Sequence, residues 1–130
     1  MSNVILICDK SFSKADQEIV DGFLEFQQAL IDKDLDKLDE IILGGDEFAN
    51  LIGDQSKKEF LSAIGNDVLK FNSCEVLDST VLFDDCGSAS LIAKVRLTVV
   101  VNEKELRVIS DSVVSFERID GKWCIGKWDS

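Results

Sequence analysis

The first half of the chain carries apolar residues at helical spacing. Over residues 13–33 they recur every three or four positions, which predicts one long helix with an apolar face. A second, shorter helix is expected over residues 35–42, and the glycine pair at 44–45 ends it. Ser56 and Glu59 have the spacing of a capping box, so a third helix is expected to begin there.

The second half alternates apolar and polar residues, which is typical of strands with one buried face. Asp120-Gly121 lies between two β-rich runs and favours a type I′ hairpin, because both central residues of that turn need a positive φ. The expected strands are residues 46–52, 71–84, 88–101 and 105–118, followed by a last strand that contains Trp123 and Trp128.

This order of elements predicts an α+β fold, with about three N-terminal helices packed on a curved antiparallel sheet. A chain of 130 residues fits a single domain. We assign that domain to residues 13–130 and regard residues 1–12 as an N-terminal arm.

The long strands carry apolar groups on both faces. Ile92 and Val100 fall on the face opposite to Leu97, and Ile109 and Val113 add apolar groups in the next strand. Helices can cover only one face of the sheet, and pairing with a second copy is the simplest cover for the other. We therefore expect a homodimer that associates through a sheet face.

The net charge of −11 arises from 25 acidic and 14 basic residues. A surface of this sign repels phosphate backbones and anionic lipids, so no nucleic acid and no membrane is expected among the partners. The apolar run at residues 4–8 is too short for a secretory signal and follows no basic segment, which favours a cytoplasmic protein.

Reactive groups are scarce in this sequence. The chain contains no His and no Tyr, so two common proton-transfer side chains are missing. Its four cysteines, Cys8, Cys74, Cys86 and Cys124, form no C-x-x-C pair, and we expect reduced, mostly buried thiols rather than a zinc site. No metal and no cofactor is expected.

Five segments carry a family resemblance. They are residues 26–38 (FQQALIDKDLDKL), 46–48 (DEF) with Gly53, 55–61 (QSKKEFL), 87–91 (GSASL) and the ending 116–130 with its Asp-Gly-Lys-Trp turn. In this order they resemble the nuclear transport factor two-like superfamily, most closely its small SnoaL-like and DUF4440-type domains. The resemblance covers about residues 13–130. It implies a cone-shaped fold, frequent dimers, and a pocket between the long helix and the concave sheet face.

The aromatic residues of the helices and the last strand are the expected lining of that pocket. We expect Phe23, Phe26, Phe48, Phe60 and Trp123 to surround an apolar or weakly polar small molecule.

The catalytic residues that the resemblance implies are largely absent. Phe26 stands at the helix position where a hydroxyl would be needed, and Asn50 stands where the DUF4440-type pattern often carries His. Asp111 interrupts an apolar strand; if it is buried, its pKa rises and it acts as a base with Arg96 or Asn50. Alternatively, Asp111 faces solvent or a subunit interface and pairs with a basic residue such as Arg96. Arg96 would then be an exposed charge that pairs across strands.

Three functions stay open at this point. The first is a homodimeric, non-catalytic domain with a small-molecule pocket lined by the five aromatic residues together with Asn50, Arg96 and Asp111. The second is an isomerase, dehydratase or hydrolase that uses Asp111 with Arg96 or Asn50. The third is a protein-interaction module. The direction in which Asp111 points discriminates between the first two.

Overall fold

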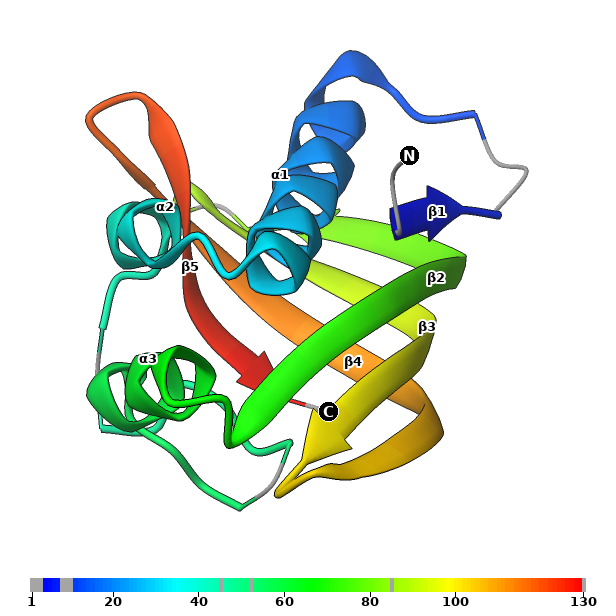
Figure 1. The fold of residues 1–130 in the computed structure, drawn as a ribbon. Helices are drawn as coiled ribbons and strands as arrows, with labels where there is room; N and C mark the ends of the chain where they lie inside the picture. The colour runs from blue at the N-terminus through cyan, green and yellow to red at the C-terminus, as the bar shows by residue number, and fades with distance from the viewer. Residues whose placement is uncertain (1–3, 8–10, 45, 52, 85, 130) are drawn as a thin grey trace.

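The computed structural model describes residues 4–7, 11–44, 46–51, 53–84 and 86–129, and Cys8, Gly45, Ile52 and Ser130 of the sequence analysis lie outside these ranges. The described residues form three helices that lie on one face of a curved five-stranded sheet (Figure 1). The predicted α+β architecture is therefore confirmed.

The elements follow the predicted order, with one additional strand at the start. The helices are α1 (Lys14–Asp32), α2 (Leu35–Ile41) and α3 (Lys57–Gly65). The strands are β1 (Val4–Leu6), β2 (Leu69–Phe83), β3 (Ser88–Val101), β4 (Lys104–Ile119) and β5 (Lys122–Asp129). The strands lie in the sheet in this same order; β1 is parallel to β2 and the other neighbours are antiparallel.

Side-chain caps set the helix boundaries. The Ser13 hydroxyl accepts a hydrogen bond from the Asp16 backbone N–H at the start of α1, and Lys33 ends that helix in the left-handed conformation, with φ of 56°. At α3 the predicted capping box is present, because Ser56 and Glu59 each accept from the other's backbone N–H at 3.1 Å.

The Asp120-Gly121 hairpin forms as predicted. Asp120 has φ of 52° and Gly121 has φ of 79°, so both central residues lie in the positive region that a type I′ turn needs. The turn pairs Ile119 with Lys122, and a register shift at Gly126 then places Trp128 opposite Val114. The last strand thereby brings its large aromatic side chain under the helices.

The segment 46–52 is not the strand that the sequence predicted. Ala49 makes only isolated bridges, one to Gln55 and one to Trp128. Gly53, with φ of 102°, turns the chain back on itself, so the segment is too short to continue a ladder.

The N-terminal arm contributes a strand that the sequence analysis did not predict. Val4 lies opposite Cys74 and Leu6 opposite Val76, so β1 forms an edge of the sheet beside β2. Three residues are too few to show a convincing alternation in the sequence.

The sheet has a covered inner face and an open outer face. On β3 the inner side chains from residue 89 to residue 99 are all buried; they are Ala89, Leu91, Ala93, Val95, Leu97 and Val99. The outer residues Ile92, Lys94 and Arg96 are exposed. The helices α1, α2 and α3 all lie on the inner face (Figure 1).

Gly121→Ala tests the hairpin. A Cβ at this glycine would meet nothing within 4 Å, so the substitution changes only the backbone preference. We expect the free energy of unfolding to fall by about 1 kcal/mol, because an L residue is strained at positive φ. Gly121→Asn is the matched control, since Asn tolerates this conformation, and should lose clearly less in urea unfolding. Equal losses for both variants would contradict the assignment.

Candidate functional site

Aromatic side chains fill the space between α1, α3 and the sheet. The Trp128 ring lies 5.4 Å from Phe26, 6.3 Å from Phe60 and 5.9 Å from Phe71, measured between ring centroids. Phe48 joins the same cluster at 5.3 Å from Phe60. Each of these rings is at most 1% exposed, so the rings pack against one another rather than around an open cavity.

Backbone bonds hold the loop between α2 and α3 against this cluster. The Trp128 backbone N–H donates to the Phe48 carbonyl at 2.7 Å, and the Phe48 N–H donates to the Gln55 carbonyl at 2.7 Å. Phe48 is therefore the one ring of the cluster that is carried by a loop, whereas Phe26, Phe60 and Trp128 lie in helices or a strand.

Several buried polar atoms lie in this apolar interior without a partner. Neither Nε2 nor Oε1 of Gln27 has a hydrogen-bond partner among the described residues, and the same holds for Ser112 Oγ and Trp128 Nε1. Gln27 and Ser112 are fully buried. Ser112 and Val114 share the inner face of β4, and Trp128 lies opposite Val114, so Ser112 and Trp128 are close neighbours.

Of the expected pocket residues, the structure brings together Phe26, Phe48 and Phe60 in the cluster around Trp128. Phe23 is also fully buried, in the same core. Trp123 lies apart from the cluster, at the hairpin end of the sheet. It packs on Phe83 at 6.2 Å, receives the Arg118 guanidinium on its ring, and donates to Glu18 at 3.3 Å.

Asp111 and Arg96 lie on the outer face of the sheet, away from the aromatic cluster. Asp111 is exposed and lies opposite Lys94. The Arg96 guanidinium pairs with Glu75 at 2.7 Å, so the expected Arg96–Asp111 pair is wrong. The cause is the register, which places Arg96 opposite Ile109 on β4 and opposite Glu75 on β2.

Asn50 lies in the loop after α2 and is half-buried. Its Nδ2 donates to Asp129 Oδ1 at 3.2 Å, which fixes the loop to the end of β5. No contact among the described residues joins Asn50 to Asp111 or Arg96, so the structure does not assemble the proton-transfer set that the sequence analysis considered.

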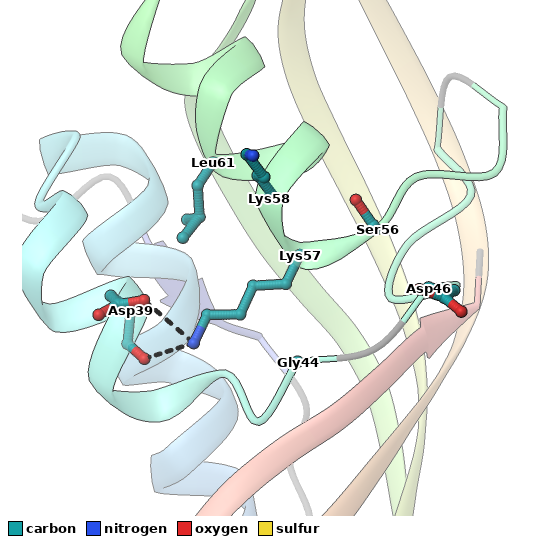
Figure 2. A pocket seen from close by; sticks show the side chains of 7 residues that line it. All are labelled: Asp39, Gly44, Asp46, Ser56, Lys57, Lys58 and Leu61. Atoms are coloured by element: carbon teal, nitrogen blue, oxygen red, sulfur yellow. Dashed lines mark hydrogen bonds and ion pairs between the residues drawn. The ribbon is translucent and has the colours of Figure 1, made fainter.

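A cleft of about 620 Å³ lies between α2 and α3 (Figure 2). Its lining residues are Asp39, Gly44, Asp46, Ser56, Lys57, Lys58 and Leu61. Lys57 Nζ donates to the backbone carbonyls of Asp39 at 2.8 Å and Ile42 at 2.7 Å, and it pairs with the Asp39 carboxylate at 3.1 Å. This ammonium group therefore caps the end of α2, and the Asp39 carboxylate balances its charge.

Neither a protein-family model nor a curated protein matches this chain. Solved structures do match. An NTF2-like protein from Cytophaga hutchinsonii has a TM-score of 0.76 at 14% identity, with 91% of this chain and 97% of that chain covered. An NTF2-like protein of unknown function in nutrient uptake from Rhodospirillum rubrum has a TM-score of 0.75 at 14% identity, covering 85% and 94%.

The chain has an NTF2-like fold. A third similar structure, a putative Ca/calmodulin-dependent kinase II association domain from Exiguobacterium sibiricum, has a TM-score of 0.73 at 10% identity over 92% and 94% of the two chains. The resemblance inferred from the sequence is confirmed at the level of the fold. Likeness at these identities shows how the chain folds, and the function must come from the site itself.

The described part of this NTF2-like domain offers little for metal or thiol chemistry. No group of three or more Cys, Asp or Glu side chains in that part could hold a metal ion. Burial, with a smaller contribution from Glu75, raises the pKa of the Cys74 thiol to about 12, which keeps it protonated and unreactive. Cys124 is buried and Cys86 is exposed. No described helix has the length and apolar character needed to span a bilayer.

Sequence reasoning missed the buried polar groups of this NTF2-like domain. Gln27 follows Phe23 by one helical turn and so belongs to the inner stripe of α1, and Ser112 has the inner parity of β4. A polar residue at an apolar periodic position was the available signal. Lys57 gave no comparable signal, because its partners on α2 are set by the tertiary structure.

Lys57→Met tests the cap that joins α3 to α2. Methionine keeps the aliphatic stem but leaves the carbonyls of Asp39 and Ile42 without their charged donor. We expect the free energy of unfolding to fall by about 1.5 to 3 kcal/mol, as for other hydrogen bonds to charged groups. Lys58→Met is the control, because the Lys58 side chain is exposed. This variant should change the free energy of unfolding by clearly less in denaturant unfolding. Equal effects would refute the capping role.

Proposed function

We propose that this NTF2-like domain is a homodimeric, non-catalytic binding domain whose interior accepts a small, uncharged, mostly apolar molecule with a hydrogen-bonding group. The observation that carries the proposal is that buried polar atoms of Gln27, Ser112 and Trp128 have no hydrogen-bond partner among the described residues. Burying such groups without partners is costly, and native proteins seldom leave them so.

The surroundings of these atoms define the ligand class. The side-chain amide of Gln27 supplies both a donor and an acceptor, the Ser112 hydroxyl can act as either, and the Trp128 indole N–H donates. Among the described residues, the buried polar side chains are those of Gln27, Ser79 and Ser112. None of these side chains ionises near neutral pH. A neutral ring compound with a carbonyl, hydroxyl or amide group fits this combination of rings and neutral polar groups.

Entry of a ligand requires a ring to move, because the aromatic side chains are closely packed. Phe48 supports this role best, since it is carried by the loop between α2 and α3 and its ring lies over Phe60. Displacing Phe48 would open the interior from the side of the loop without breaking a helix or a strand.

The position of the ionisable residues supports binding rather than catalysis. A base needs to reach the bound molecule, and Asp111 and Arg96 lie on the other side of the sheet from the aromatic cluster. The isomerase, dehydratase or hydrolase alternative would need a carboxylate that reaches the interior, and none of the buried described residues supplies one.

Gln27→Leu tests the ligand proposal with benzamide, which combines an aromatic ring with an amide, as the probe. In ¹H–¹⁵N spectra benzamide should shift the Trp128 indole N–H and the Gln27 side-chain resonances. The leucine variant should bind benzamide about tenfold more weakly, because it loses one or two hydrogen bonds between neutral groups. It should be at least as stable as the parent in urea, since an unpaired buried amide is replaced by an apolar group.

Gln28→Leu is the matched control on the adjacent, half-buried position of α1, and it should leave benzamide binding unchanged. The ligand proposal fails if benzamide leaves the Trp128 indole resonance in place at saturating concentration, or if both leucine variants bind it as the parent does.

The dimer part of the proposal rests on the outer face of the sheet. Ile92 is 43% exposed and Val113 is 39% exposed, and the two lie opposite one another on β3 and β4. The neighbouring row contains Asp78, Lys94 and Asp111, with the lysine between the two carboxylates. An apolar strip beside a row of mixed charge suits self-association through one two-fold axis. A similar structure is described as a putative association domain, which is consistent with a fold that can serve in association.

Ile92→Asp tests the face contact. A carboxylate in the apolar strip would be desolvated on association. We therefore expect the dissociation constant of the dimer to rise at least tenfold in sedimentation velocity. Val68→Asp is the control, because Val68 is comparably exposed, at 38%, but precedes β2 rather than lying in the outer strip. A parent chain that binds a different protein through this face, and not itself, would instead favour the interaction-module alternative.

A further inference from the structure

β4 has a long stretch of edge that no described strand covers. β5 pairs with β4 only between Val113 and Ile119, whereas β3 pairs with β4 from Lys104 to Glu117. Residues 104–111 of β4 therefore continue beyond the end of β5 into the hairpin with β3 (Figure 1). The outward N–H and C=O groups of such an edge can pair with an added strand.

The side chains of this edge are exposed on both faces of the sheet. On the inner face Leu106 is 40% exposed and Val108 is 38% exposed, because the helices do not reach this end of β4. On the outer face Glu105 and Arg107 are exposed. An edge with this composition favours a partner strand that offers apolar groups on one face and both signs of charge on the other.

We propose that this edge pairs antiparallel with the same edge of a second copy of the chain, about a two-fold axis at Leu106. In this register Glu105 of each copy lies opposite Arg107 of the other, which gives two opposite-charge pairs on the outer face. Leu106 lies opposite its own counterpart on the inner face, and Lys104 lies opposite Val108. The two five-stranded sheets then continue into one another.

The charges select this register over its neighbours. The inner faces of the two copies lie on the same side of the joined sheet only if the two-fold axis passes through a residue. The alternative registers therefore place the axis at a neighbouring residue. At Glu105 or at Arg107 it would place that residue against itself, and like charges directly opposite one another repel. At Val108 it would place Glu105 opposite Asp111.

The position of β5 favours the same register. With the axis at Leu106, Asn102 in the hairpin turn of one copy lies opposite Ser110 of the other, so the added strand stops before Val113, where β5 begins to pair. With the axis at Val108, the same turn would lie opposite Val114 and collide with Trp128, which already pairs there. Pairing in the favoured register therefore involves residues 104–108 of both copies.

This edge contact is separate from the outer-face contact of the proposed function. Ile92 and Val113 lie farther along the strands, and an edge contact leaves their face open. A chain that uses both contacts would associate beyond a dimer, and a chain that uses the edge alone would form a dimer.

The test is a charge reversal with a built-in rescue. Glu105→Arg gives a chain with two arginines at the edge, and Arg107→Glu gives a chain with two glutamates. Each variant alone places like charges opposite one another, so sedimentation velocity should show association weakened about tenfold or more. An equimolar mixture of the two variants pairs arginines with glutamates and should recover the parent's association, as should the double variant E105R/R107E.

Glu47→Arg is the control, since it makes the same change of charge at an exposed loop residue away from the edge. It should associate as the parent does. Repeating the series on an Ile92→Asp background separates the two contacts: the edge contact should survive there and still respond to the reversals. The proposal would be overturned if the Ile92→Asp chain without further changes stayed monomeric up to submillimolar concentration. It would also be overturned if each single charge reversal associated as strongly as Glu47→Arg, or if the mixture of the two reversals did not restore association.

Discussion

Packing around the indole ring of Trp128 holds the three parts of this protein together. The ring lies edge-on to Phe26 of α1, contacts Phe60 of α3 and tilts against Phe71 of β2. Its backbone N–H holds the Phe48 loop. Truncation of a buried aromatic ring of this kind costs about 3–5 kcal/mol, a large part of the stability of a small domain. The helices, the loop and the last strand therefore depend on one another for their positions.

The same packing limits what the interior can do. Aromatic rings occupy the space between the long helix and the sheet, and the polar side chains of Gln27 and Ser112 are fully buried. A ligand would have to displace a side chain, so binding and local opening would be coupled. Charged side chains lie elsewhere: Arg96 pairs with Glu75 on the outer face, and Lys57 caps the end of α2.

Most of the fold could be predicted because its signals are local. The capping box at Ser56, the Asp-Gly turn and the alternation along β3 each depend on residues close in sequence, and each formed as expected. The short strand at residues 46–52 failed because its pairing depends on a turn at Gly53 and on Trp128, far away in the chain. The candidate site was predicted less well for the same reason.

The sequence alone determined the elements, their order and the presence of apolar groups on both sheet faces. Only the tertiary structure decided which face is which, because a strand's alternation is the same whichever side the helices cover. That choice placed Asp111 and Arg96 outside, and brought Gln27, Ser112 and Trp128 inside. Because β5 pairs only with Val113–Ile119, no described strand covers residues 104–111 of β4, which no local pattern could reveal.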